Sequence, residues 1–122
     1  MEKIKIISSE NILPIETNKD GIIITPILTP DDGAQWRSSI KIHLKKNKKT
    51  KSIKLNSECV FFVLKGEGII FDETENRKTN IKNQKMVFIT PNTSFSLLTS
   101  SEELLLLGGP CPFDKNILTL GD

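Results

Sequence analysis

The sequence predicts an all-β protein of antiparallel strands. Apolar residues recur with a period of two, or in short runs that end at turn-forming residues, and almost nowhere with the spacing of a helix. Roughly eight to ten such segments follow one another at regular spacing, which is typical of a β-sandwich or β-barrel. The chain has 122 residues and contains no internal repeat, low-complexity block or linker. We therefore expect a single domain over residues 1–122.

Three segments of the N-terminal half carry the strand pattern. Residues 21–28 are apolar at consecutive positions and include Pro26, which suits an edge strand or a bulge. In residues 38–45 the isoleucines and the leucine fall on one face, and the lysine and histidine between them fall on the other. Residues 51–56 repeat this alternation. Between these two segments, residues 45–49 are polar and mostly lysine, so we expect an exposed turn like the tip of a hairpin.

The C-terminal half continues the series. Residues 59–65 form a β-branched and aromatic run. We expect the Gly66–Gly68 segment to turn the chain, so that residues 69–73 return as a hairpin partner. Beyond Gly108 the glycines and prolines of GGPCP indicate that the chain turns sharply away from the barrel. The remaining expected strands are residues 78–82, 85–90, 94–99 and 103–109.

Composition and charge exclude several classes of protein. With 37% hydrophobic and 26% charged residues, the chain has the composition of an ordinary globular domain. The start, MEKIKIISSE, alternates charge with isoleucine and has no uninterrupted apolar core, so we expect neither a signal peptide nor a spanning helix. A cytoplasmic protein without a membrane partner is the expectation. Cys59 and Cys111 are then free thiols.

The net charge of +2 conceals a cluster of lysines between Lys41 and Lys54. Such a cluster raises the question of nucleic-acid binding. Nucleic-acid grooves normally combine positive charge with aromatic platforms or bidentate arginines, and this run contains neither. We therefore expect a solvated turn and no nucleic-acid partner.

Two segments resemble the two sequence motifs of small single-domain cupins. They are VFFVLKGEG, residues 60–68, and MVFITPNTSFSL, residues 86–97, and the fit runs from about residue 38 to residue 109. The resemblance implies a double-stranded β-helix, the antiparallel jelly-roll barrel of that family. It also implies where metal ligands would lie, since the first motif of the family typically supplies two histidines and a glutamate, and the second a further histidine.

The sequence departs from the family at every one of these ligand positions. If the first motif is aligned one residue further along, Ile53 and Leu55 occupy the two histidine positions, and these side chains cannot bind a metal either. A transition metal needs several converging N, O or S ligands, and the single histidine, His43, cannot supply them alone. We therefore expect a barrel that keeps its cavity without a metal or other cofactor. The side chains at the corresponding positions are Ser52 and Lys54, Cys59, and Phe95.

The cupin pattern also places a set of side chains in the barrel interior or at its mouth and far wall. This arrangement gives a mainly apolar lining with a few polar groups, which is the usual chemistry of a small-molecule pocket. Met86 is a further candidate for the wall. The candidate ligand-binding residues are Trp36, Arg37, His43, Ser52, Lys54, Cys59, Phe61 and Phe95.

Each reactive candidate has a functional and a structural interpretation. A desolvated Lys54 would pair with a carboxylate or phosphate, whereas the structural interpretation is that its side chain only extends into solvent. His43 is either an acid or base, or an exposed cross-strand histidine. Cys59 is either a nucleophile or a buried inert thiol. Trp36 and Arg37 would clamp a ligand, or else Trp36 plugs the end of the barrel.

Three functions remain open at this point. We expect a metal-free protein that binds a small anionic or sugar-like metabolite in the barrel cavity. The first alternative is a metal-independent isomerase, epimerase or lyase that uses His43, Lys54 or Cys59, and it requires these groups to converge in one cavity. The second is a dimerising structural module, which a completely filled barrel would favour. Fold alone does not choose among them.

Two runs, residues 22–24 and 104–107, are apolar at consecutive positions. Strands that are apolar on both faces must bury both faces against other structure, and the sequence offers no amphipathic helix that could pack there. A second copy of the chain is the simplest cover, so we expect a homodimer.

Overall fold

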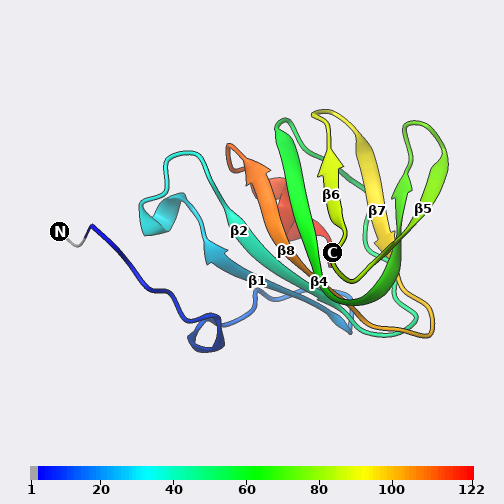
Figure 1. Cartoon of the computed structure of the whole chain (residues 1–122), viewed down its shortest axis with the longest axis horizontal. Coiled ribbons are helices and arrows are strands. Elements are labelled where there is room, and N and C mark those ends of the chain that lie inside the picture. The colour runs from blue at the N-terminus through cyan, green and yellow to red at the C-terminus, as the bar shows by residue number, and fades with distance from the viewer. Residues whose placement is uncertain (1–2) are drawn as a thin grey trace.

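Two curved antiparallel sheets face each other in the computed structural model, which describes residues 3–122 (Figure 1). Sheet A contains β1, β2, β8, the first half of β4 and β6, and sheet B contains β3, β7, the second half of β4 and β5. The predicted all-β class is confirmed. The strands are β1 (Ile22–Leu28), β2 (Ser39–Leu44), β3 (Ile53–Lys54), β4 (Glu58–Asp72), β5 (Arg77–Lys82), β6 (Met86–Ile89), β7 (Ser94–Leu98) and β8 (Leu104–Cys111).

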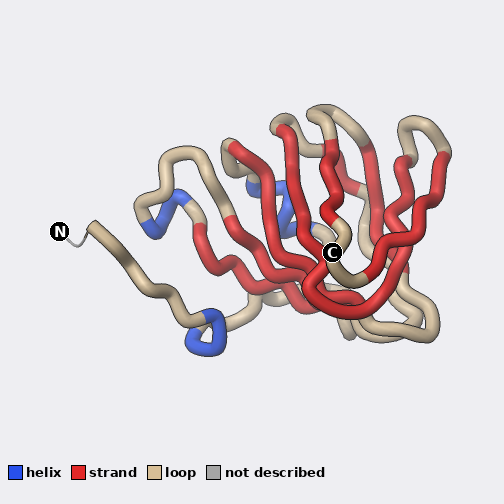
Figure 2. The backbone as a smooth tube through the Cα atoms, in the orientation of Figure 1, coloured by secondary structure: helices blue, strands red, loops and turns tan. Residues whose placement is uncertain are grey.

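In the described part of the chain, helix is confined to three short 3-10 turns, at Ser9–Asn11, Pro30–Asp32 and Lys115–Thr119 (Figure 2). Within residues 3–122 no helix is long and apolar enough to cross a membrane.

β4 is the strand that joins the two sheets. We expected a hairpin at Gly66–Gly68, and this expectation is wrong: the strand runs unbroken from Glu58 to Asp72 and bends from sheet A into sheet B. A register irregularity between Val63 and Lys65 and a positive φ of 92° at Gly66 produce the bend. A Cβ at Gly66 would collide with the carbonyl oxygen of Glu103, so only glycine fits there.

The core lies between the sheets and follows the predicted alternation. In β2 the buried residues are Ile40, Ile42 and Leu44, as expected. The C-terminal segment adds Ile117 and Leu120, both fully buried, so this tail is anchored to the core by apolar side chains. Phe113 and Leu118 pack against the same core as partly buried residues.

Two further expectations need correction. β8 does not end at the glycines, because Gly109, Pro110 and Cys111 still pair with the start of β4. Pro110 lacks an N–H but remains compatible with the extended backbone, so the chain leaves the sheet only after Cys111. The stretch of residues 45–49 is largely exposed, as predicted, but it is no hairpin tip, because β2 and β3 belong to different sheets.

Candidate functional site

The barrel interior is apolar at the positions where the sequence motifs of cupins place ligands. Ile53 on β3 pairs with Phe95 on β7, and both are buried. Leu55, Cys59 and Phe61 are buried in the same core. At these motif positions the interior therefore presents only hydrocarbon and one thiol.

Ser52 and Lys54 were expected to point inward, and that expectation is wrong. Both are exposed, whereas Ile53 and Leu55 are buried. The side-chain period of a strand is two, so a register shift of one residue exchanges the two faces completely. Burial of two aliphatic side chains fixes the register here, since it stabilises the fold and leaves the lysine in water.

A small pocket remains between the sheets, at the side of the barrel formed by β5 and β6. Its volume is about 180 Å³, and we call it the barrel pocket. Phe95 belongs to its lining, so of the candidate ligand-binding residues it is the one that reaches this space. The residues that line it are Ile70, Asp72, Thr79, Val87, Phe88, Ile89, Thr90, Thr93 and Phe95.

Asp72 is the charged group of the barrel pocket. One carboxylate oxygen, Oδ1, accepts hydrogen bonds from the backbone N–H groups of Thr74 and Glu75, each at 3.0 Å. The turn after β4 thus fixes the direction of the carboxylate. Arg77 lies opposite Asp72 in the β4–β5 register and is exposed. At the rim, the hydroxyl groups of Thr90 and Thr93 are 2.8 Å apart and hydrogen bonded.

Cys59 is an inert thiol in this environment. Its side chain is 1% exposed, and burial raises the pKa of the thiol to about 12. A thiol with such a pKa holds its proton at neutral pH and is neither a nucleophile nor a ready metal ligand.

No protein-family model matches the sequence, and no curated protein matches it. Solved structures do match. The polyketide cyclase RemF from Streptomyces resistomycificus superposes with a TM-score of 0.78 at 15% identity, over 91% of this chain and 80% of the other. An RmlC-like cupin with a double-stranded β-helix fold from Methanocaldococcus jannaschii superposes with a TM-score of 0.72 at 14% identity, over 96% of this chain and 98% of the other. The chain has the cupin fold. Ectoine synthase from P. lautus is also similar, with a TM-score of 0.75 at 18% identity over 91% and 80% of the two chains.

A metal does not fit the interior of this cupin fold. Ile53, Leu55 and Phe95 carry no donor atom, and the thiol of Cys59 is protonated. Elsewhere in residues 3–122, no three histidine, cysteine, aspartate or glutamate side chains lie close enough together to hold a metal ion.

The remaining candidate residues lie outside the cupin barrel. Trp36 and Arg37 are exposed in the segment between β1 and β2, with Trp36 66% exposed. Met86 is exposed on the outer face of β6. The expectation that these side chains form the mouth or wall of the barrel is wrong, because the mouth lies at β5 and β6 and Met86 points away from it.

His43 is on the outer face of sheet A. Its Nε2 lies 2.6 Å from Oε1 of Glu103, in a recess that also includes Lys46 and Lys65. Lys54 is exposed on β3 and Cys59 is in the core, so the structure does not bring these three reactive groups together. Glu103 was not anticipated, because sequence alone does not reveal that the residue before β8 lies beside β2.

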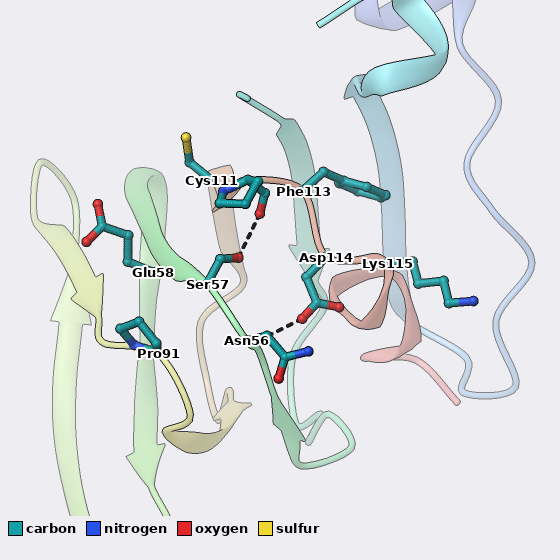
Figure 3. Close-up of a pocket in the computed structure, with 9 residues that line it drawn as sticks. Asn56, Ser57, Glu58, Pro91, Cys111, Phe113, Asp114 and Lys115 are labelled. Carbon is teal, nitrogen blue, oxygen red and sulfur yellow. Dashed lines mark hydrogen bonds between the residues drawn. The ribbon is translucent and has the colours of Figure 1, made fainter. Parts of the chain in front are cut away.

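A depression of about 590 Å³ is wide and open, and the C-terminal segment crosses it (Figure 3). Its polar groups already hold this segment in place. The Ser57 hydroxyl donates to the Pro112 carbonyl oxygen at 2.7 Å, and the backbone N–H of Asn56 donates to Asp114 at 2.8 Å (Figure 3). Asp114 also accepts from the N–H of Asn116. Because these polar groups are already hydrogen bonded within the chain, the barrel pocket is the better candidate for a ligand site.

Among the residues of the barrel pocket, Asp72 and Thr79 were missed by the sequence reasoning. The sequence contains an indication of both residues. Asp72 is a carboxylate at the end of an apolar strand, and Thr79 lies on the β5 face that also carries the buried Ile81. The two residues can be assigned to one pocket only when β4 is treated as one continuous strand.

Proposed function

We propose that this protein binds a small, uncharged molecule with several hydroxyl groups, of sugar-like chemistry, in the barrel pocket and without a metal. The observation that carries this proposal is the lining of the pocket, in which one oriented carboxylate and three threonines face an apolar wall. Carboxylate and hydroxyl oxygens accept hydrogen bonds from ligand hydroxyl groups. Aliphatic and aromatic side chains cover the C–H face of the same ligand.

The charge of Asp72 distinguishes the two ligand classes that the sequence left open. A carboxylate in the lining repels an anion, and Arg77, its partner in register, is exposed at the edge rather than paired with it. Sugar-like neutral ligands are therefore favoured over anionic ones. The volume of about 180 Å³ lies below the roughly 300–1,000 Å³ of pockets for drug-sized ligands, so the ligand is compact.

The structural neighbours support a small-molecule role for the fold. A polyketide cyclase and an ectoine synthase are among them, so the same architecture serves chemistry on small molecules. The metal-independent enzyme that the sequence suggested gains no support, because His43, Lys54 and Cys59 lie apart. Both cysteines are free, which suits the cytoplasmic location that we expect.

Thermal-shift assays with neutral hexoses and the matching hexuronic acids test the proposal. We expect at least one neutral hexose to raise the melting temperature, and its hexuronic acid to bind more weakly because Asp72 repels the added carboxylate. Thr79→Trp fills the pocket and abolishes the shift. Asn80→Trp is the matched control, because Asn80 is exposed on the opposite face of β5. A shift that survives in Thr79→Trp, or a preference for the acids, contradicts the proposal.

We also propose that the protein is a homodimer. Met86 and Phe88 of β6 are 67% and 59% exposed on the outer face of sheet A, beside Phe62 of the adjacent β4, and neighbouring large apolar side chains favour association. The fold itself gives sheet A two open edges, at β1 and β6, which association would help to protect.

A further inference from the structure

Sheet A carries an apolar patch on its outer face, away from the core. Phe62 and Leu64 of β4 are 37% and 45% exposed, and Met86 and Phe88 of β6 are exposed still more. Phe62 pairs with Met86, and Val60 pairs with Phe88, so the side chains lie side by side. We call these five residues the β4/β6 patch. A contiguous patch of this kind on adjacent strands marks an interaction surface.

Within β4 itself, opposite charges lie at the two ends of the patch. Glu58 begins β4, and Lys65 lies seven residues further along the same strand, next to Leu105 of β8. Both are exposed, and neither takes part in an ion pair among residues 3–122. Lys85, which immediately precedes β6, adds a second positive charge at the Lys65 end, since its carbonyl oxygen accepts from the N–H of Val63.

A hollow of about 370 Å³ adjoins the patch at the Glu58 end. Gly108 and Gly109 of β8 form its floor, because they present no side chains, and Val60 and Phe62 border it. Arg37 lies on its far side. The hollow offers room for one apolar side chain of a partner.

We propose that a second copy of the chain docks on the β4/β6 patch, sheet A against sheet A, with the two β4 strands antiparallel about a two-fold axis that crosses them near Phe62. This inference deepens the proposed homodimer by assigning its interface and orientation. Sheets that pack face to face lie about 10 Å apart, which matches the reach of interdigitating Phe, Leu and Met side chains. An isologous pair buries the same patch on both copies.

The charges select the antiparallel arrangement. With the strands antiparallel, Glu58 of each copy faces Lys65 of the other, and Leu64 of each copy lies over the hollow of the other. With the strands parallel, Glu58 would face Glu58 and Lys65 would face Lys65, and such like-charge contacts disfavour docking. A patch whose ends are complementary to each other suits a second copy better than an unrelated partner.

Sedimentation equilibrium with charge-swap variants tests this interface. We expect a dimer for the natural chain, weakened about tenfold in dissociation constant by Glu58→Lys or by Lys65→Glu alone, because each swap creates two like-charge contacts in a symmetric pair. The double variant, Glu58→Lys with Lys65→Glu, restores the dimer to within about threefold. The proposed orientation is wrong if the single swaps leave the dissociation constant unchanged, or if the double variant dimerises no more tightly than the single variants. Either result still leaves the protein a dimer.

Loss of the apolar contact is tested separately. Leu64→Asp is expected to yield a monomer that keeps the far-ultraviolet circular dichroism of the natural chain. Asn80→Asp, exposed on sheet B, is the control and stays dimeric. A monomeric natural chain at micromolar concentration overturns both the homodimer and its interface. Failure of sugar binding, in contrast, bears only on the barrel pocket.

Discussion

Ile53 of β3 and Phe95 of β7 are opposite each other in an antiparallel pair, and both are buried, at 6% and 1% exposure. The pair occupies the part of the barrel where cupin-like motifs would supply metal ligands. Hydrocarbon therefore fills the space, and the remaining polar chemistry is displaced toward Asp72 and the threonines at the mouth.

Substitution of Ile53 tests the register of β3. Ile53→Ala removes buried apolar surface and leaves a cavity, so we expect it to lower the free energy of unfolding by about 2–4 kcal/mol. Lys54→Ala, at the neighbouring exposed position, is expected to change it by less than about 0.5 kcal/mol. Urea denaturation measures both. Equal effects of the two substitutions would mean that β3 does not present Ile53 to the core.

Metal analysis tests the chemistry of the interior. Elemental analysis of untagged protein is expected to find no transition metal at a stoichiometric level, because the motif positions offer only the protonated thiol of Cys59 and no three potential ligands gather elsewhere in residues 3–122. Added zinc is likewise expected to leave the melting temperature unchanged. One zinc, iron or manganese ion per chain that is lost in Cys59→Ala would contradict this account.

Alkaline pH is expected to destabilise the protein through Cys59. The unfolded chain releases the thiol proton above its ordinary pKa of 9.0, whereas the folded chain, with a pKa of about 12, retains it. The stabilising contribution is therefore complete below pH 9 and is lost as the pH rises from 9 toward 12, at a rate that approaches about 1.4 kcal/mol per pH unit.

Urea denaturation between pH 8 and pH 10 measures this dependence. The lysines also begin to titrate in this range, so the informative quantity is the difference in slope between the natural chain and Cys59→Ala. The variant is expected to show the shallower decline. Parallel declines would indicate that the thiol of Cys59 is accessible to water.

The bend of β4 depends on Gly66. Gly66→Ala places a Cβ against the carbonyl oxygen of Glu103 in addition to the strain of a positive φ. Gly33→Ala is the matched control, because Gly33 has a similar φ of 99° and open space around it. We expect the control to lower the free energy of unfolding by about 1 kcal/mol and Gly66→Ala by roughly 3 kcal/mol or more. Similar effects at both positions would show that the backbone relieves the clash without cost.

The periodicity of the sequence predicted most of the fold, because alternation reports burial directly. The buried positions of Ile40 and Ile42 in β2 followed from it, whereas Pro26 indicated the edge or bulge that β1 shows. The same signal did not determine long-range geometry. Gly66 and Gly68 suggest a turn locally, and only their close approach to the chain around Leu104 shows that they bend a continuous strand.

The candidate site was predicted less completely. Cys59, Phe61 and Phe95 are interior, as expected, but the motif alignment placed Lys54 inside where the alternation itself favours Ile53. The barrel pocket could not be derived, because it joins β4, β5 and β6 across turns whose pairing the local sequence does not specify. Likewise, the contact between His43 and Glu103 spans 60 residues.

Methyl-resolved NMR during titration with a neutral hexose tests ligand binding in the barrel pocket. We expect saturable shifts of the methyl signals of Ile70, Val87 and Ile89, which line the pocket, and none for Ile23 on the outer face of β1. We also expect Thr79→Trp to abolish these shifts. Saturable shifts confined to methyl groups outside the pocket, or no response to any neutral hexose, would contradict ligand binding in this pocket.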